Sequence, residues 1–367
     1  MLRTDDHLNL WPDQRVREFT GGRLIVPRET TPLGRLLPYR RAAGETPPPG
    51  IGELVHERGW SVDLGNRGLG DVLLGLAMVR ALHDVTGDRF ELEYLGPRPG
   101  LMRRSTLPMR VGQSNETGHI VQTVTAHPVP FAAMPEEPPT WLDLLDGDHV
   151  EIHAALPMRY YLQIELATGC RLPAAAAPAP AFTSTILAAE PFHVVFATTT
   201  SMPGRKDYGA AQFAKVAAEL TNRAHGDWRF TLITPLGAAG QRLAWQGPPV
   251  AVLDGADATD CIDVFASAQL VVGNDTGLTH LAALTTRVDG TGPDVVGLYG
   301  RHAHTKWITG SPRHHAIATP FSQLLAAADR CPVRDRYDDG VWGRSADLPS
   351  ISPTQVAEYA GVRAGWW

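Results

Sequence analysis

The sequence predicts an α/β protein built from two doubly wound domains. Stretches typical of buried strands alternate with helical stretches in two separate parts of the chain, a pattern that indicates parallel sheets covered by helices. A run of proline and alanine, CRLPAAAAPAPAF at residues 170–182, lies between the two parts as a linker would. The length of 367 residues is large for one hydrophobic core and suits two domains of ordinary size.

The composition places the chain among soluble globular proteins, with 43% hydrophobic and 20% charged residues. The formal net charge of -6 gives no basic field, so nucleic acid is not expected as a partner. Three widely spaced cysteines, none in a CxxC pair, indicate neither a disulfide framework nor a thiolate zinc site, which favours the cytoplasm. No signal peptide and no run of about 18 apolar residues is found, so neither secretion nor a membrane span is expected.

The first part of the chain contains one clear βαβ unit. Residues 1–55 are rich in Arg, Pro and Gly, contain one strand-like run, LIV, and are interpreted as an N-terminal extension. The N-terminal domain, residues 56–182, opens with a strand, SVDLGN, a helix, VLLGLAMVRALHDVTG, and a second strand, FELEYLG. This order predicts a parallel sheet. Residues 97–160 are proline-rich, with short strand-like pieces such as HIVQTV, and receive no firm assignment.

The second domain is expected at residues 183–340. Five strands alternate there with helices, and the strands read HVVFATT, RFTLITP, VAVLD, LVVGN and DVVGLYG. The helices between them read AAQFAKVAAELTNR, AGQRLAW, TDCIDVFASA and LTHLAALTT. Residues 341–367 hold a last helix with Ser352 as its cap and Pro353 at its first position, and packing back on the N-terminal domain is one option for it.

A glycine-rich turn, NRGLGDVLLG, marks the first candidate site. Gly68 and Gly70 precede Asp71 where the first strand gives way to the first helix. A phosphate-binding turn would not carry a carboxylate there, and the dinucleotide fingerprint has Leu73 where its third glycine should stand. Two interpretations remain: Asp71 caps the helix, or it is presented for chemistry at the carboxyl end of a strand, where α/β folds place their sites.

A second strand-to-helix turn lies in QLVVGNDTGLTHLAAL. A buried strand there ends in four small or polar residues, Asn274, Asp275, Thr276 and Gly277. This turn predicts a site for a diphosphate. The N–H groups of the following helix and the Thr276 hydroxyl can bind an anion, and His280 can add a charge or a donor. The triplet DTG also occurs in aspartic proteases, but those need an all-β context and a second copy, and this chain has a helix after its single copy.

The loop FATTTSMPGRKDYG, residues 196–209, combines short hydroxyls with positive charge. Thr199, Thr200 and Ser201 supply the hydroxyls, and Arg205 and Lys206 supply the charge. These groups are the ones that stabilise a diphosphate leaving group, although a solvated loop without a ligand is the alternative.

Four histidines crowd the segment RHAHTKWITGSPRHHAI: His302, His304, His314 and His315. They have no carboxylate or cysteine at ligand spacing, so they are expected on the surface or at the rim of a cleft, and no metal is assigned.

Four of these stretches together resemble a known family. GLGDVLLGLAMVRAL resembles the N-terminal signature of the lipopolysaccharide heptosyltransferases, glycosyltransferase family 9. NDTGLTHLAAL is similar to the C-terminal signature of that family, and VVGLYG to the strand that follows it. The loop ATTTSMPGRKDYGAAQF resembles the family's loop of paired threonines followed by a lysine.

The resemblance implies a GT-B fold, with two Rossmann-like domains facing each other across a cleft and inverting, metal-independent sugar transfer. Asp71 would then be the catalytic base, beside an acceptor-side turn that contains Gly68 and Gly70. Lys206 would lie near the leaving phosphate. The donor-binding residues would be Asp275, Thr276, Gly277 and His280, together with Thr199 and Thr200, which match less directly because this loop is longer.

The expected function is transfer of a heptose or hexose from a nucleotide-diphosphate donor, ADP-heptose or another NDP-hexose, to a hydroxyl acceptor, without a cofactor. The loop TPLGAAGQRLA lacks the acidic residue that the family usually uses for the ribose, which leaves Gln241 or the backbone. A small soluble acceptor, such as a natural product, is preferred to a lipid core, with at most a weak membrane contact through Arg35, Arg40 and Arg41. The alternatives are a lipopolysaccharide-core heptosyltransferase proper, a non-catalytic sugar-nucleotide binder and, disfavoured by the broken fingerprint, an oxidoreductase.

Overall fold

A computed structural model describes ten parts of the chain, and all structural statements concern these parts. They are residues 60–63, 68–86, 92–94, 98–111, 122–125, 155–158, 161, 178–237, 239–328 and 343–367. The expected N-terminal extension, with its LIV run and Arg35, Arg40 and Arg41, lies outside them, as does most of the proposed linker.

The larger unit is a six-stranded parallel sheet with the order β12-β11-β9-β6-β7-β8. Its strands are β6 (His193–Ala197), β7 (Arg229–Thr234), β8 (Ala251–Asp254), β9 (Leu270–Asn274), β11 (Asp294–Tyr299) and β12 (His314–Ala318). The helices that alternate with them are α9 (Ala210–Arg223), α10 (Ala239–Ala244), α11 (Ala258–Ser267), α12 (Gly277–Leu284), α13 (His304–Trp307) and α14 (Pro320–Ala328). Two 3-10 turns, η2 (Gly343–Ala346) and η3 (Leu348–Ser350), lead to helix α16 (Pro353–Arg363).

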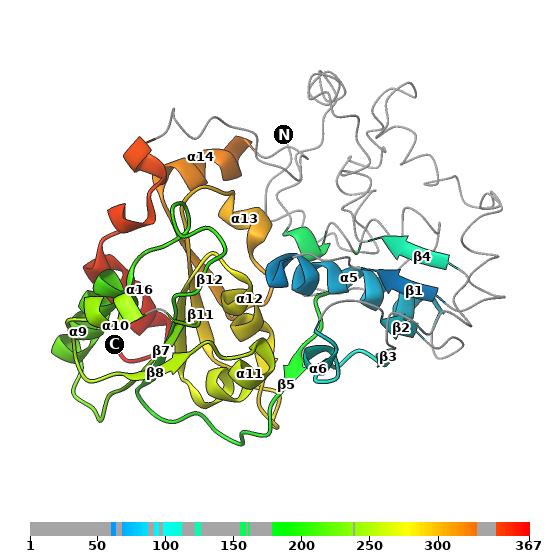
Figure 1. Cartoon of the computed structure of the whole chain (residues 1–367), viewed down its shortest axis with the longest axis horizontal. Helices are drawn as coiled ribbons and strands as arrows, with labels where there is room; N and C mark the ends of the chain where they lie inside the picture. The colour runs from blue at the N-terminus through cyan, green and yellow to red at the C-terminus, as the bar shows by residue number, and fades with distance from the viewer. Residues whose placement is uncertain are drawn as a thin grey trace.

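The central strands are mainly apolar and are buried along almost their whole length, since both faces of the sheet are covered. Alternate side chains of β6 and β9, such as Val194 and Val272, join one hydrophobic cluster with α9 and α16. The residues between them, such as Val195 and Val271, join a second cluster with α11 and α12. The sheet is therefore the middle layer of a three-layer unit (Figure 1).

The smaller unit is a four-stranded parallel sheet with the order β3-β2-β1-β4. Its elements are β1 (Trp60–Asp63), α5 (Leu69–Thr86), β2 (Leu92–Tyr94), α6 (Pro99–Met102), β3 (Met109–Val111) and β4 (Gln122–Thr125). Strands β1 and β2 are parallel and joined through α5, which confirms the βαβ unit. Helix α5 is apolar through most of its length and buries Val72, Leu73 and Leu76.

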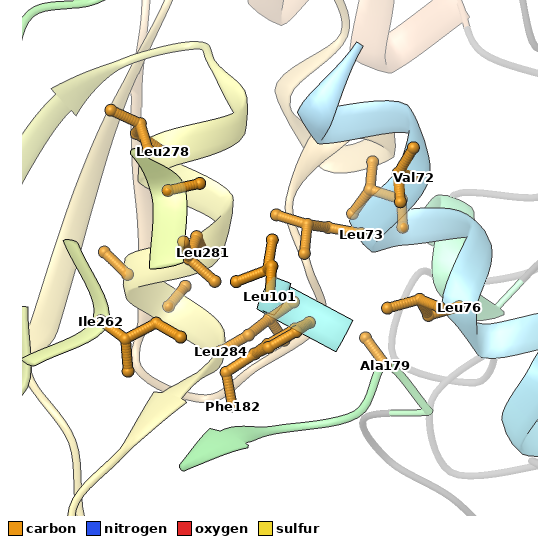
Figure 2. Close-up of a cluster of buried hydrophobic side chains, with 14 of the residues drawn as sticks. Val72, Leu73, Leu76, Leu101, Ala179, Phe182, Ile262, Leu278, Leu281 and Leu284 are labelled. Atoms are coloured by element: carbon orange, nitrogen blue, oxygen red, sulfur yellow. The ribbon is translucent and has the colours of Figure 1, made fainter. Parts of the chain in front are cut away.

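Helix α5 packs on α12, so one hydrophobic cluster spans the two units. Figure 2 shows Leu73 of α5 directed toward Leu281 of α12, with Leu101 of α6 and Phe182 completing the cluster. Burial of this apolar surface favours the approach of the two helices, each of which begins at a glycine-rich turn.

Polar contacts also join the two units at the edge of this hydrophobic cluster. Strand β5 (Phe182–Thr183) pairs with β10 (Thr285–Thr286), and Thr183 N–H donates to the carbonyl of Arg104 at 2.8 Å. The guanidinium of Arg104 forms an ion pair with Asp263 on α11, with 2.8 Å between Nη2 and Oδ1. The domain boundary expected after Phe182 falls inside β5, and the boundary itself stays a prediction.

One expectation about the second unit is wrong. Its sheet has a sixth strand, β12, where five were expected, because the HHAIA segment drew attention only for its histidines. Helix α16 packs on α9, where Val356, Ala357 and Ala360 join the apolar cluster, and a contact with the N-terminal domain stays a prediction. The helix does begin at Pro353, but the Ser352 side chain makes no capping hydrogen bond.

None of the helices within the described residues is both long and apolar enough to cross a membrane.

Candidate active site

The strand order places the candidate site at the carboxyl edge of the larger sheet. Successive strands β6, β7 and β8 extend the sheet one way, while β9, β11 and β12 extend it the other way from β6. Open α/β sheets bind ligands where this order reverses. The loops that leave β6 and β9, residues 198–209 and 274–276, meet at this point, and both were selected from the sequence.

Asn274 ties these two loops together. Its buried side chain accepts a hydrogen bond from Tyr208 N–H at 3.0 Å and donates to the carbonyl of Thr198 at 3.0 Å. It also donates to the Asp207 carboxylate at 3.2 Å. The sequence indicated Asn274 only as part of the turn, and its bonds now explain how the loop holding Lys206 is fixed against the strand of Asp275.

Lys206 and Asp275 form the central ion pair of the site, with 2.8 Å between Nζ and Oδ2. The side chain of Asp275 is 2% exposed and that of Lys206 is 16% exposed, so the pair is largely shielded from water. Burial acts to raise the pKa of Asp275, but the charges of Lys206 and then of His302 outweigh it and keep that pKa below its usual value. Asp275 is therefore ionised, and its charge is balanced by Lys206.

His280 lies in the first turns of α12, buried and facing the smaller unit. Burial is the main cause that lowers the pKa of His280 to about 4, against the opposing effect of Asp275. Its Nε2 is 3.9 Å from Asp275 Oδ1, beyond hydrogen-bonding distance. The sequence suggested that His280 supplies either a charge or a hydrogen-bond donor. Because burial keeps the imidazole neutral near neutral pH, only the role of donor remains.

The two glycine-rich turns are in direct contact. A Cβ atom on Gly277 would lie 2.6 Å from the backbone nitrogen of Gly70 and 2.6 Å from the Cβ of Leu69. A Cβ atom on Gly70 would lie 3.0 Å from Nδ1 of His280. Only residues without side chains allow the helix ends to approach so closely, and this contact brings the first turn of α5 to the predicted donor site.

Asp71 follows directly in that first turn of α5 and is partly buried. A Cβ atom on Gly68 would lie 3.3 Å from Asp71 Oδ2, so the carboxylate lies over the start of its own helix. This position fits both interpretations made from the sequence, because a helix cap and a carboxylate offered to a ligand both lie at the helix start. Its role as a base stays a prediction.

The predicted hydroxyl groups have different surroundings. The Thr200 hydroxyl accepts a hydrogen bond from Met202 N–H at 3.1 Å within its own loop, and Thr199 is partly exposed. Thr198, which was not selected, is fully buried and donates to the carbonyl of Ile233 at 2.8 Å. The Thr276 hydroxyl is buried and has no hydrogen-bond partner among the described residues. Of these hydroxyls, that of Thr276 is therefore the best candidate to bind a ligand. The donor-binding roles of Thr199 and Thr200 stay predictions.

The loop after β11 contributes residues that the sequence analysis did not select. The Trp307 ring centroid lies 5.8 Å from Lys206 Nζ and 5.7 Å from the ring of His302. The signal was available, because this loop leaves a central strand at the same carboxyl edge as the two selected loops.

The histidine-rich segment has a structural role at one position. His314, expected on the surface or at the rim of a cleft, is instead 5% exposed, with Nε2 3.1 Å from the Tyr299 hydroxyl and Nδ1 3.1 Å from the backbone nitrogen of Thr309. Within the described ranges, no three His, Cys, Asp or Glu side chains cluster as metal ligands would.

Comparison with known proteins finds a family similar to the second unit. Residues 160–332 match glycosyltransferase family 9 (heptosyltransferase). The matched segment is similar to this family, and residues 1–159 and 333–367 lie outside the match. This match includes Lys206, Asp275 and His280, whereas Asp71 lies before it.

Solved structures support the fold of both units. A family 9 glycosyl transferase from Veillonella parvula aligns with a TM-score of 0.54 at 12% identity, covering 84% of this chain and 98% of its own. The E. coli heptosyltransferase WaaC with ADP aligns with a TM-score of 0.50 at 17% identity, covering 73% and 97%. TibC, an iron-containing dodecameric glycosyltransferase from enterotoxigenic E. coli, has a TM-score of 0.50 at 13% identity, covering 84% and 76%. The predicted GT-B fold is confirmed, and no curated protein matches the sequence.

Proposed function

We propose that this protein transfers a sugar from a nucleotide-diphosphate donor to an acceptor hydroxyl, with inversion at the anomeric carbon. One observation carries the proposal: the Gly70–Asp71 turn contacts the Gly277–His280 turn, beside the ion pair of Lys206 and Asp275. A carboxylate and a helix start suited to phosphate thus approach each other from two units. A single displacement needs such an arrangement, with a base on one face of the sugar and the leaving group on the other.

In this proposal Asp71 accepts the proton of the acceptor hydroxyl as that oxygen attacks the anomeric carbon. The bond to the diphosphate breaks, and the negative charge that develops on it is stabilised by the N–H groups at the start of α12, the Thr276 hydroxyl and Lys206. Because Asp275 already balances Lys206, the ion pair serves mainly to hold the ammonium group in place. Thr199 and Thr200 are proposed to complete the donor site.

The donor is proposed to be ADP-heptose or another NDP-hexose, and the acceptor a small soluble molecule. The related fold of WaaC was determined with ADP, and that of TibC with ADP-D-beta-D-heptose, which supports a sugar nucleotide here. The net charge of -6 makes an anionic lipid surface a poor partner. A lipopolysaccharide-core acceptor is the main competitor.

A nucleotide screen tests the donor proposal. Thermal unfolding is followed with ADP-, GDP-, UDP- and dTDP-sugars, and with NAD as the control for an oxidoreductase. A sugar nucleotide at a hundred times its Kd should stabilise the folded state by about 2.7 kcal/mol. Stabilisation by NAD alone would contradict the proposal, and binding without transfer to any acceptor would indicate a non-catalytic binder.

Independence from metal ions is a separate part of the proposal. The leaving group is stabilised by protein donors, so transfer should be unchanged when EDTA is present throughout the assay. TibC is described as iron-containing, so iron, magnesium and manganese are each added back in turn. Activity that requires one of these ions would refute metal independence while leaving the donor proposal intact.

A further inference from the structure

Three buried hydrogen-bond donors follow strands β9 and β11, and one of them, the indole of Trp307, lies beside Lys206. The indole Nε1 of Trp307 and the hydroxyls of Thr276 and Thr305 are inaccessible to water and have no hydrogen-bond partner among the described residues. They belong to the loops after β9 and β11, which leave adjacent strands at the same edge of the sheet. A buried donor without an acceptor is costly, and most such groups are hydrogen-bonded to protein or water, so three of them at one edge of the sheet indicate a position that a ligand can occupy.

Trp307 is the most informative of these groups because an indole N–H can only donate. Its ring also packs against the hydrophobic cluster that joins α5 and α12, and Lys206 Nζ lies 5.8 Å from its centroid. The side chain is therefore held between the apolar junction of the two units and the charged centre of the donor site.

We propose that Trp307 binds the donor substrate directly, with its indole N–H donating to a phosphate oxygen of the diphosphate. This inference rests on the proposed function. The neighbouring groups that could share the ligand, Lys206, Thr276 and Thr305, are all able to donate, so the complementary ligand is rich in acceptors. A diphosphate has this property, whereas a sugar hydroxyl both donates and accepts. The Trp307 ring additionally limits where the Lys206 ammonium group can lie.

The test is calorimetric titration of the Trp307→Phe variant with the nucleoside diphosphate that binds wild type best in the screen. Phenylalanine keeps an aromatic ring beside Lys206 and removes the N–H. A lost hydrogen bond to a charged group should weaken diphosphate binding at least tenfold. If the N–H contacts the second phosphate group, the variant should bind the corresponding nucleoside monophosphate less than threefold more weakly than wild type does. Its affinity for the full sugar nucleotide should fall by the same factor as its affinity for the diphosphate.

Trp245→Phe is the matched control. Trp245 Nε1 donates to the carbonyl of Pro248 at 2.8 Å, and the ring packs with Phe196 in the other hydrophobic cluster. The same substitution there removes an indole hydrogen bond that is already satisfied within the protein, so nucleotide affinity should remain unchanged. If Trp307→Phe does not fold, β-(3-benzothienyl)alanine at position 307 keeps the shape and volume of the ring and removes only the N–H.

The outcomes separate the inference from the function on which it rests. Wild-type affinity of the position-307 variants for the diphosphate would overturn the role of Trp307, while the proposed function would stand. A loss seen with the sugar nucleotide but not with the diphosphate would also overturn it, because the N–H would then contact the sugar. Failure of wild type itself to bind any nucleotide would refute the proposed function and the inference together.

Discussion

Helices α5 and α12 of this protein each have an aspartate within two residues of their first residue, and the two aspartates lie in opposite environments. Asp275, before Gly277 of α12, is buried and paired with Lys206 at 2.8 Å. Asp71, after Gly70 of α5, is only partly buried and lies over the start of its own helix. The local sequences, GNDTGLTH and RGLGDVLL, share glycines and one acid, so residue type alone does not distinguish the two roles.

The difference follows from what the rest of the fold brings to each turn. The turn before α12 receives the loop of residues 198–209, which Asn274 fastens so that an ammonium group meets the carboxylate. A carboxylate balanced in this way no longer repels a phosphate from the helix start. The turn at α5 is brought to the same place by packing between the units, and we expect its carboxylate to act on a proton.

The largest effect is expected when the balanced carboxylate is neutralised. Asp275→Asn leaves the shielded ammonium of Lys206 without its counter-charge, which should lower the free energy of unfolding by roughly 3 kcal/mol. Chemical denaturation measures this change. Adding Lys206→Met to Asp275→Asn should restore most of the stability but not nucleotide binding. If Asp275→Asn alone were as stable as wild type, the ion pair would contribute nothing to the fold.

Asp71→Asn should behave in the opposite way, with little effect on stability and a large one on rate. Removing a general base should lower kcat at least a hundredfold, about 2.7 kcal/mol in the activation free energy, while the affinity for the donor changes little. Steady-state kinetics with the identified donor, alongside calorimetry, measures both. A variant that kept half of the wild-type rate would assign Asp71 to capping α5.

Much of the second unit could be predicted because its signals are local. Strands such as LVVGN are continuous apolar runs, and helix AAQFAKVAAELTNR appears with the predicted bounds as α9. Strand β12 was missed because its sequence, HHAIA, has histidines at the front and only a short apolar part. The partner of α16 was also not predictable, since an amphipathic helix shows that one face is buried but not what covers it.

The site could be predicted as a set of residues but not as an arrangement. The chain positions of Lys206 and Asp275 are far apart, and their pairing depends on how the loops after β6 and β9 fold together. The protonation of His280 depends on its burial, which no local pattern reveals. The roles of Asn274 and Trp307 likewise follow from contacts between loops that leave different strands.

The neutral state of His280 predicts how stability changes with pH. In the unfolded chain this imidazole takes up a proton near pH 6.5, but the folded protein resists protonation until about pH 4, so acid favours unfolding between these values. From pH 6.5 to 5 the cost is about 1.6 kcal/mol for this group. The contribution of Asp275, whose pKa is lowered, is lost only at pH values below this range.

His280→Gln removes the titrating group and serves as the comparison. Its free energy of unfolding should fall less steeply than that of wild type over this interval, whatever its absolute stability. Parallel slopes for the two proteins would mean that His280 takes up a proton in the folded state as readily as in the unfolded chain. His280 would then bind a diphosphate as a cation, whereas we now expect the smaller contribution of a neutral hydrogen bond, about 0.5–1.5 kcal/mol.

The contact between the two turns predicts a graded series of alanine substitutions. In Gly277→Ala the new Cβ would lie 2.6 Å from the backbone nitrogen of Gly70, so α5 itself must shift. Overpacking of this kind costs about 1–3 kcal/mol, and the displaced α5 should also lower kcat by carrying Asp71 away from the donor. In Gly70→Ala the new Cβ would lie 3.0 Å from Nδ1 of His280, a side-chain atom that can move, so both losses should be smaller.

Gly204→Ala completes the series as the neutral member, because nothing lies within 4 Å of the added Cβ and the residue does not have a positive φ. Denaturation midpoints and kcat measured on all three variants should rank Gly277→Ala as most damaging, then Gly70→Ala, then Gly204→Ala. If Gly277→Ala kept wild-type turnover while losing stability, the contact between the turns would hold the units together without positioning Asp71. In that case Asp275 would still be the aspartate that stabilises the fold, but the contact between the turns would no longer support a catalytic role for Asp71.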